Sequence, residues 1–238
     1  MVKELIKKAK LELKIRSGAI TRIKKETAVN YKWHGNKYGG FYVHPDGLNS
    51  NSIVYSFGIG EDISFDQSVI DSYGCNVFAF DPTPKSIAWI KSQQLSPKFN
   101  FFDYGIDAKT GFVNFNLPKN ENYVSGSILN HQNVNENNTV SVPMKCFKDI
   151  TQLLGHKHID VLKIDIEGSE YVVIDDILAG GVEIDQILLE LHERFFDDGK
   201  AKTRALLKSL KDHGYSVFAV SDSAEEISFI KNSSAANT

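Results

Sequence analysis

The sequence is poor in the features that mark disulfide-stabilised, zinc-binding or membrane-spanning proteins. It has only two cysteines, Cys75 and Cys146, which lie far apart in the chain, so neither a disulfide framework nor a paired-cysteine zinc motif is expected. No run approaches the roughly 18 uninterrupted apolar residues of a transmembrane helix. The net charge is only −3 and the pI is near 6.2, which argues against a protein built to coat nucleic acid.

The N-terminus carries the strongest local charge. Residues 1–26 contain nine Lys or Arg and three Glu, and they lack the apolar stretch of a secretory signal, so a cytoplasmic protein is expected. Leu5, Ile6, Ala9 and Leu13 fall on one stripe of a helix with lysines around it. The favoured interpretation is a solvated helix that packs this stripe on the domain behind it. The alternative is a weak peripheral contact with an anionic partner or membrane face.

The remaining composition is that of one soluble globular domain. The chain has 238 residues, of which 42% are apolar and 24% are charged, enough for a core of its own. We expect a leading segment with a basic helix and aromatic residues over 1–50, and a main domain over 51–231 with an insertion-like region at 103–143. A disordered tail is expected at 232–238.

Short apolar runs alternate with amphipathic helical patterns through the main domain. This alternation predicts an α/β fold with a mostly parallel sheet and helices on both faces. The last two strands are joined too closely for a crossover, so an antiparallel hairpin is expected at one edge. Ligands of such sheets bind beyond the carboxyl ends of the strands, at the switch point in strand order. Strands are expected at 53–57, 77–80, 99–102, 159–164, 184–191, 215–220 and 227–230, and helices at 64–72, 84–94, 169–178 and 200–213.

The first candidate site is a glycine turn after the first strand of the main domain. Phe57 ends that strand, and Gly58 and Gly60 allow a tight turn against which a nucleoside can lie. Asp81 directly follows the second strand, close to the spacing of about 20 residues expected for a carboxylate that holds ribose hydroxyls. The turn therefore predicts a nucleoside site.

The same turn argues against a dinucleotide. Ile63 stands where the dinucleotide fingerprint has its third glycine, and Glu61 and Asp62 place negative charge where a pyrophosphate would bind. A nucleoside with a positive charge and no phosphate suits these acids, and S-adenosylmethionine is such a molecule. The alternatives are an NAD(P)-binding oxidoreductase and a glycine turn needed only for packing.

Ionisable side chains follow two later strands. Alternate residues of a strand share a face, so Lys163, Asp165 and Glu167 are expected to point one way. Glu190 and His192 share a face in the same manner and should lie beside Asp165 if the two strands are neighbours. Buried charges must be paired or used. Lys163 is therefore expected to pair with a carboxylate, either as a structural ion pair or in catalysis.

Together these segments resemble the FkbM family of S-adenosylmethionine-dependent methyltransferases, over residues 53–192. The most specific part is LKIDIEGSEY at 162–171, around an Asp-x-Glu-Gly core. The glycine turn and the segment that contains Asp81 look especially like the methyltransferase-like branch of this family. The supporting segments are VYSFGIGEDISFD at 54–66, FDPTP at 80–84, VPMKCFKDI at 142–150 and ELH at 190–192.

The resemblance implies a class I methyltransferase (Rossmann-like) fold with a seven-stranded sheet, and O-methylation of a hydroxyl on a sugar, glycan or natural product. It also implies contacts with the cofactor, although the family commonly has an Asn-containing segment where this chain has Asp103 and Tyr104. By resemblance, Phe57, Gly58, Ile59, Gly60 and Glu61 would cradle the methionine moiety, Asp81 would hold the ribose, Pro82 and Thr83 would flank the adenosine, Asp103 and Tyr104 would border the adenine, and Asp165 would lie by the transferable methyl.

A hydroxyl acceptor needs a base or a metal ion to become nucleophilic. His192 is the expected general base because its ordinary pKa is near 6.5, and Lys163 is an alternative if burial lowers its pKa. Asp165 and Glu190, with Glu167, could instead bind Mg²⁺ through oxygen ligands. Metal-free catalysis is favoured, because these carboxylates can simply neutralise Lys163. A catalytically silent module that keeps the nucleoside pocket is a further alternative.

Two segments could bind the acceptor. Aromatic residues before the first main strand could stack on a sugar above the cofactor, although such residues more often pack as core or lid. The Asn-rich segment 130–138 could line the same site. The aromatic residues are Trp33, His34, Tyr38, Phe41 and Tyr42.

Overall fold

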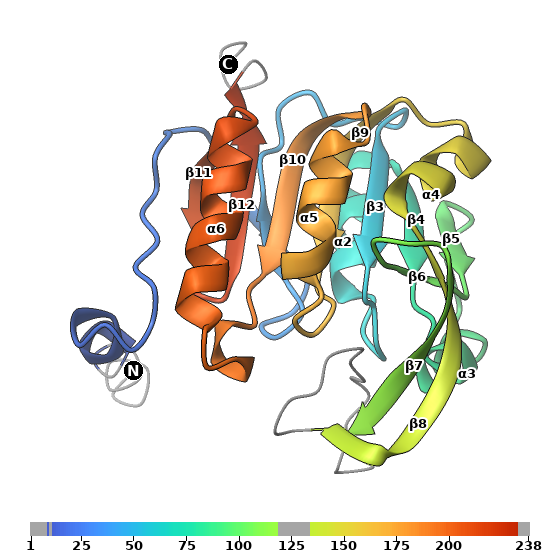
Figure 1. Cartoon of the computed structure of the whole chain (residues 1–238). Helices are drawn as coiled ribbons and strands as arrows, with labels where there is room; N and C mark the ends of the chain where they lie inside the picture. The colour runs from blue at the N-terminus through green and yellow to red at the C-terminus, as the bar shows by residue number, and fades with distance from the viewer. Residues whose placement is uncertain (1–8, 10, 119–133, 233–238) are drawn as a thin grey trace.

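A computed structural model of the protein describes residues 9, 11–118 and 134–232. Its central element is one mostly parallel sheet (Figure 1). In spatial order its seven strands are β11 (Tyr215–Val220), β12 (Glu226–Lys231), β10 (Glu183–Glu190), β9 (His158–Ile164), β3 (Ile53–Phe57), β4 (Asn76–Phe80) and β5 (Phe99–Phe102). The predicted fold class is confirmed. The C-terminal hairpin is antiparallel and lies at one edge of the sheet as expected, and β12 lies between β10 and β11.

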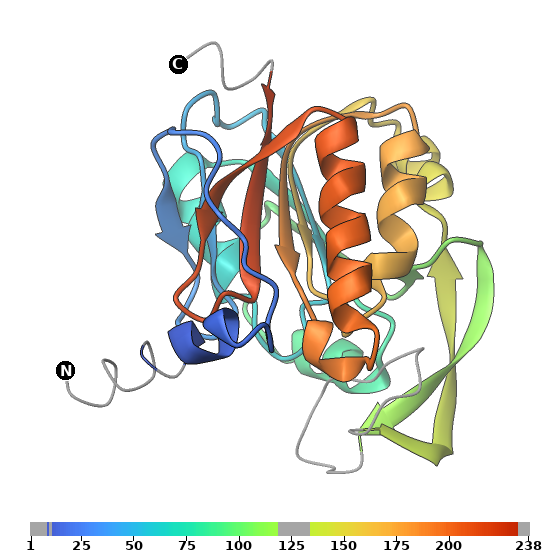
Figure 2. The same ribbon diagram turned by 60° about the vertical axis from the view of Figure 1, so that its left-hand side comes forward.

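Both faces of the sheet are buried, which explains the nearly continuous apolar strand sequences. In β3, Val54 packs into the core on one face, while Tyr55 and Phe57 pack into the core on the other. Figures 1 and 2 show α2 (Ser64–Tyr73) and α3 (Pro84–Ile90) on one face, and α4 (Phe147–Leu154), α5 (Glu170–Ala179) and α6 (Gly199–Asp212) on the opposite face.

Helix α3 is shorter than the predicted range 84–94. It ends at Ile90, and Ser92 and Gln93 form turn-type hydrogen bonds to residues three positions earlier. The reason is that residues 92–94 are Ser-Gln-Gln, which offer no apolar side chain to hold another turn against the sheet. The helix that follows β4 therefore stops within two turns.

A small hairpin that the sequence did not predict covers part of the sheet. Strands β1 (Lys32–His34) and β2 (Phe41–Val43) pair antiparallel. The side-chain amide of Gln186 in β10 accepts a hydrogen bond from His44 N (2.8 Å) and donates one to His44 O (2.9 Å). Ser228 Oγ in β12 donates to Tyr42 O at 2.8 Å. These long-range bonds hold the hairpin over β10 and β12.

The residues before this hairpin run along the sheet edge. Residues 11–16 are helical, and further on Glu26 N donates to Val217 O of β11 at 2.7 Å. The side chain of Leu13 is 67% exposed, so the expected packing of its stripe on the domain is wrong at this position. The reason is the orientation of the helix, which leaves Leu11 and Ile15 partly buried and Leu13 exposed. Residues 1–8 lie outside the described part, so an anionic contact stays a prediction.

The insertion-like region forms a second sheet. Strand β8 (Val134–Lys145) pairs antiparallel with β7 (Gly111–Pro118) and parallel with β6 (Gly105–Ile106). Figure 1 shows β7 and β8 extending past the lower edge of the main sheet. Residues 119–133, which include the start of the Asn-rich segment, and residues 233–238 of the predicted tail lie outside the described residues. None of the described helices is long and apolar enough to cross a membrane.

Candidate active site

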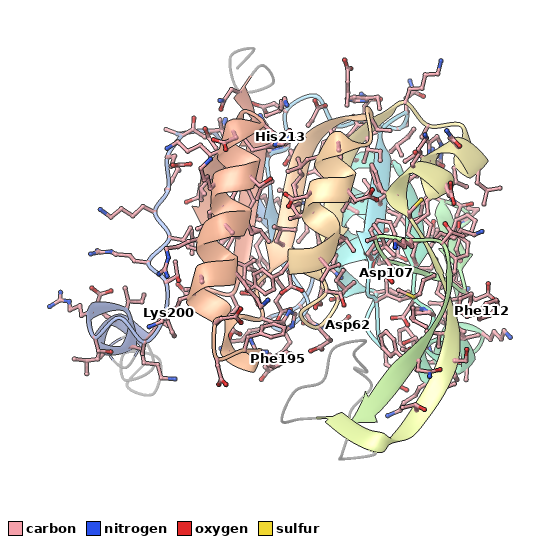
Figure 3. All side chains as sticks on the ribbon, viewed as in Figure 1. Asp62, Asp107, Phe112, Phe195, Lys200 and His213 are labelled. Carbon is pink, nitrogen blue, oxygen red and sulfur yellow. The ribbon has the colours of Figure 1, made fainter. Side chains whose placement is uncertain are left out.

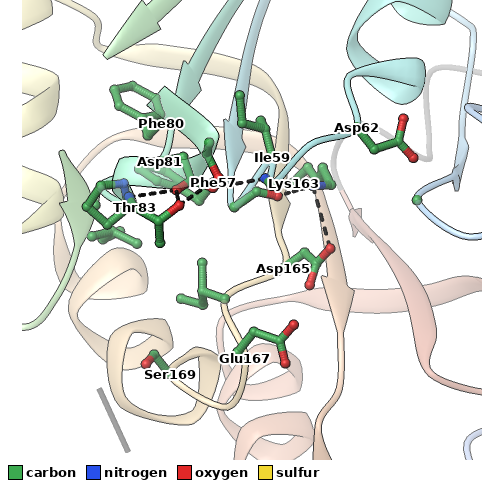
Figure 4. Close-up of a pocket in the computed structure, with 18 of the residues that line it drawn as sticks. Phe57, Ile59, Asp62, Phe80, Asp81, Thr83, Lys163, Asp165, Glu167 and Ser169 are labelled. Carbon is green, nitrogen blue, oxygen red and sulfur yellow. Dashed lines mark hydrogen bonds and ion pairs between the residues drawn. The ribbon is translucent and has the colours of Figure 1, made fainter. Parts of the chain in front are cut away.

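A cleft of about 410 Å³ opens at the carboxyl ends of β3, β4 and β9, where the strand order reverses (Figure 4). Figure 3 places Asp62 at this lower edge of the sheet and His213 at the opposite edge. The cleft contains most of the cofactor residues that the sequence predicted, together with Lys163 and Glu167. The predicted cofactor residues that line it are Phe57, Gly58, Ile59, Gly60, Glu61, Asp81, Pro82, Thr83 and Asp165.

Gly58 forms the sharp turn at the centre of the cleft. Its φ is +77°, and a Cβ at this position would lie 1.7 Å from the carbonyl oxygen of Asp165. Gly58 N donates to Phe80 O at 2.9 Å, and Gly58 O accepts from Lys163 Nζ at 2.8 Å. Only glycine satisfies both the backbone angle and the close approach.

Asp81 is oriented into the cleft and is only 5% exposed. Its Oδ1 accepts hydrogen bonds from Thr83 N (2.9 Å) and Thr83 Oγ1 (2.6 Å), and its Oδ2 accepts one from Gly60 N (2.9 Å). Each carboxylate oxygen can accept two hydrogen bonds. Oδ2 therefore keeps one lone pair available for a ligand hydroxyl.

The acidic residues of the turn have structural partners as well. Asp62 Oδ1 accepts from Ser64 N at 2.8 Å, at the start of α2, and its Oδ2 accepts from Asn36 Nδ2 at 2.6 Å. Glu61 lies 4.0 Å from Lys85 Nζ. Both carboxylates line the cleft, so an anionic ligand would meet negative charge here and a cationic one would be attracted.

The two residues that the resemblance assigns to the adenine, Asp103 and Tyr104, are not among the residues that line the cleft. Asp103 is exposed, and the ring of Tyr104 packs 5.6 Å from the rings of Phe80 and Phe102. Neither residue lines the cleft, because the aromatic core draws Tyr104 inward and brings β6 and the β7–β8 hairpin to this wall. The residues that form the wall are Gly105, Ile106, Phe115 and Met144.

Lys163 is buried beneath the glycine turn. Besides its bond to Gly58 O, its Nζ lies 3.8 Å from Asp165 Oδ2 (Figure 4), so the predicted pairing with a carboxylate is confirmed. Asp66 of α2 is also buried, and one of its carboxylate oxygens has no hydrogen-bond partner among the described residues. Burial raises the pKa of Asp66, although the charge of Lys163 opposes the shift. Sequence reasoning missed Asp66, which looks like an ordinary acid in the first turn of a helix.

His192 lies behind the cleft, 1% exposed and surrounded by carboxylates. Its Nδ1 is 3.2 Å from Glu170, and its Nε2 is 3.4 Å from Glu167, 3.6 Å from Glu190 and 3.9 Å from Asp165. The predicted neighbourhood of His192, Glu190 and Asp165 is therefore confirmed, because β9 and β10 are adjacent.

These carboxylates change the protonation of the cluster. Burial alone would lower the pKa of His192, but the hydrogen bond and charge of Glu170, with the charges of Glu167 and Asp165, raise it to about 10. Burial, and then the charge of Asp165, raise the pKa of Glu190 to about 9. At neutral pH the imidazole of His192 is charged and Glu190 is protonated.

Glu170 is the residue of this cluster that sequence reasoning missed. It is fully buried at the start of α5 and accepts hydrogen bonds from Gly168 N and His192 N, both at 2.9 Å. These bonds tie the loop after β9 to the end of β10. In that loop Glu167 has a φ of +54°, an uncommon conformation for a residue other than glycine. The available signal was the position of Glu170 inside LKIDIEGSEY.

Ligand atoms of Asp165, Glu190 and His192 lie within 4.8 Å of one another. The grouping could hold a metal ion, as the sequence suggested for Asp165 and Glu190. A histidine ligand must be neutral and carboxylate ligands ionised, whereas His192 and Glu190 both hold protons at neutral pH. A metal ion bound by these three residues would therefore have to displace both protons.

The aromatic residues of the leading segment divide into two groups. His34 and Phe41 are fully buried, and His34 lies 3.0 Å from Ser68 Oγ and 2.9 Å from Tyr73 OH, so both residues are structural. Trp33, Tyr38 and Tyr42 line a second cavity of about 900 Å³ beside the cofactor cleft. Their expected contact with an acceptor is thus compatible with their positions.

The family model for the methyltransferase FkbM domain matches residues 46–217, which is well over half of the chain. The chain belongs to the FkbM methyltransferase domain family. Human probable methyltransferase-like protein 24 is 28% identical over 148 residues, which cover 60% of this chain and 33% of that protein. Its rat counterpart is 28% identical over 141 residues, which cover 58% and 32%. This FkbM chain therefore matches about a third of the length of these curated relatives. Their names agree with the methyltransferase-like branch that the sequence predicted.

Solved structures with a similar arrangement are more distant from this FkbM domain. The Methanococcus jannaschii fibrillarin pre-rRNA processing protein has a TM-score of 0.45 and 12% identity, covering 88% of this chain and 86% of that one. Human N-acetylserotonin methyltransferase, solved in complex with SAM, has a TM-score of 0.38 and 12% identity, covering 78% of this chain and 49% of that one.

Proposed function

We propose that this FkbM domain is an S-adenosylmethionine-dependent methyltransferase that methylates a hydroxyl group of a sugar, glycan or natural product. The observation that carries the proposal is the cleft at the switch point. There the turn at Gly58 and the inward carboxylate of Asp81 line a cradle in which we place the nucleoside of the cofactor. The cradle ends at Asp165, beside the cluster around His192.

The residues present fit S-adenosylmethionine better than a dinucleotide. Asp81 has a free lone pair for a ribose hydroxyl, and the backbone of Gly58 and Gly60 is open to the cleft. Glu61 and Asp62 suit a positively charged ligand and oppose a pyrophosphate. This disfavours the NAD(P)-binding alternative.

When bound, S-adenosylmethionine supplies a methyl group on positively charged sulfur: the methyl carbon passes to the acceptor oxygen, the bonding electron pair stays on sulfur, and the hydroxyl proton leaves. Lys163 fixes the glycine turn through Gly58 O, and so holds the cradle in one position. Asp165 and Glu167 line the cleft, whereas His192 lies behind them. We therefore assign removal of the proton to a carboxylate. Asp165 is the first candidate for this base, and Glu167 is the second.

His192 has a different role from the free base expected from its ordinary pKa. Because its pKa is raised to about 10, it carries a proton at neutral pH and cannot accept another. Its charged ring holds the carboxylates of Asp165 and Glu167 at the reacting centre, and Glu170 holds the ring. In this proposal His192 positions the carboxylates.

Calorimetric titration with S-adenosylhomocysteine, NAD and NADP tests the cofactor. We expect S-adenosylhomocysteine alone to bind, and D81N to weaken that binding at least tenfold, about 1.4 kcal/mol. The matched control D71N, an exposed aspartate of α2, should bind like the wild type. Binding of only the dinucleotides would end the methyltransferase proposal.

Turnover is tested with isotopically labelled S-adenosylmethionine and a panel of sugar and natural-product hydroxyl acceptors. Activity that survives EDTA and does not increase with added Mg²⁺ supports metal-free transfer. Cofactor binding without transfer to any acceptor would favour the silent nucleoside-binding module.

A further inference from the structure

The second cavity lies beside the cofactor cleft, with Glu190 in its lining within 4.8 Å of Asp165 in the lining of the cleft. It lies between the loop of the β1–β2 hairpin and the turn that joins β11 to β12, and Tyr38 lines both spaces. Asp165 lines the cleft, and its charge acts on Glu190, which lines the second cavity. The volume of about 900 Å³ is within the range of small-molecule sites, roughly 300–1,000 Å³.

One wall of this cavity is aromatic and held in place by the protein itself. The ring of Trp33 packs edge-on against Tyr42 with centroids 4.9 Å apart, and its Nε1 donates to Asn36 O at 3.0 Å. Gly40 lies so close that a Cβ there would be 2.5 Å from the indole. Tyr38 is 84% exposed. A fixed indole beside an exposed tyrosine offers a ready stacking surface for a ring-shaped ligand.

The floor of the cavity is acidic. Glu190 of β10 and Glu226 of β12 are directly opposite each other across neighbouring antiparallel strands, and both line the cavity. Like charges in that position destabilise a sheet, and burial and the charge of Asp165 raise the pKa of Glu190, so this pair holds a proton at neutral pH. Glu226 is buried and accepts hydrogen bonds from the hydroxyls of Ser221 and Ser223. The carboxylate of Glu226 can accept a further hydrogen bond from a hydroxyl or ammonium group of a ligand, whereas its charge would repel an anion.

The positive charges of this region approach the floor at Glu190. Arg194 is 2.6 Å from Glu225 and 4.0 Å from Glu190. His192 Nε2 is 3.6 Å from Glu190. Lys14 and Lys37, the lysines among the described lining residues, are exposed. A ligand thus meets the lysines at the rim and the carboxyl groups of Glu190 and Glu226 at the end nearest Asp165.

We propose that this cavity binds the methyl acceptor, and that the acceptor's reacting end is uncharged or carries an ammonium group, while a phosphate or carboxylate at that end is rejected. The inference rests on the proposed methyltransferase function. The aromatic wall gives the location of the acceptor. The opposed pair Glu190 and Glu226 gives the charge that its reacting end can carry.

The experiment uses the full chain saturated with S-adenosylhomocysteine. In a W89F background Trp33 is the one remaining tryptophan, so quenching of its fluorescence by a nitrophenyl group reports occupancy of the cavity. The probes are 4-nitrophenyl β-glucosaminide, β-glucoside and β-glucuronide, which match in size and are positive, neutral and negative at pH 7. We expect the glucuronide to bind at least tenfold more weakly than the other two.

The double variant E190Q/E226Q should reduce this discrimination to within about threefold, whereas E183Q, at the far end of β10, should leave it unchanged. Preference for the glucuronide, or no quenching by any probe at millimolar concentration, would overturn the inference. Failure of S-adenosylhomocysteine to bind would be seen first, by calorimetry, and would instead count against the proposed function. Circular dichroism of each variant confirms that the sheet is retained.

Discussion

Glu170 holds His192 from two sides: its Oε1 accepts the backbone N–H of His192 at 2.9 Å and lies 3.2 Å from the Nδ1 of the same residue. The two residues come from the start of α5 and the end of β10, so this contact joins the two elements that carry the ionisable cluster. Because Nδ1 faces Glu170, the opposite ring nitrogen is directed at Asp165, Glu167 and Glu190. The orientation of the whole cluster therefore depends on one buried carboxylate.

Replacing Glu170 by Gln keeps its size and removes its charge. We expect E170Q to lower the pKa of His192, because Glu170 supplies the foremost of the effects that raise it. Methyl transfer should slow by roughly tenfold, about 1.4 kcal/mol, with unchanged affinity for S-adenosylhomocysteine. NMR titration of isotopically labelled histidine and single-turnover rates measure the two effects. E183Q is the control, and an unaltered histidine titration in E170Q would exclude Glu170 as the positioning residue.

The pH dependence of activity separates the two roles considered for His192. If its charged form positions the carboxylates, the rate should be level through neutral pH and fall as pH rises through about 10, where His192 loses its proton. A free base with the same pKa would give the opposite sign, a rate that climbs towards pH 10. Single-turnover rates from pH 6.5 to 10 make the comparison. A steady climb over this range would return the role of base to His192.

The fold could be predicted from local patterns because each strand is a short apolar run and each helix has a packing stripe. The β1–β2 hairpin could not, because Gln186 holds it through bonds to a backbone 142 residues away. The glycine turn and Asp81 were predictable, because a glycine pair after one strand and a carboxylate after the next, about 20 residues on, are typical of a nucleoside site. Glu170 was not, because an acid in the first turn of a helix usually needs no explanation beyond the helix dipole.

The protons held by the cluster predict how stability changes with pH. The pKa of Glu190 is raised from 4.5 to about 9 and that of His192 from 6.5 to about 10, so between pH 7 and 9 the folded state binds protons that the unfolded state releases. The free energy of unfolding should therefore fall as pH rises across this window. E190Q removes one of the two groups and should make the fall shallower, by up to about 1 kcal/mol per pH unit.

Urea unfolding at pH 7, 8 and 9 measures this slope for the wild type, E190Q and the exposed control E183Q. The control should follow the wild type, because Glu183 is exposed at the opposite end of the same strand. Equal slopes for E190Q and the wild type would mean that Glu190 is ionised in the folded protein at neutral pH. A metal ion bound by this cluster would then have no proton to displace from Glu190.

Gly58 and Gly47 provide a matched pair for testing the cradle. Both have positive φ, +77° and +85°, but a Cβ at Gly58 would lie 1.7 Å from a backbone oxygen, while one at Gly47 would meet nothing within 4 Å. G47A should therefore be destabilised only by the strained backbone, by about 1 kcal/mol. It should bind S-adenosylhomocysteine normally. G58A must also push apart β3 and the loop after β9, so we expect a larger fall in thermal stability and loss of measurable binding. Calorimetry and thermal melting of the two variants, side by side, give the answer. If G58A binds S-adenosylhomocysteine as tightly as G47A, the close approach of Gly58 to Asp165 is not what shapes the cofactor site.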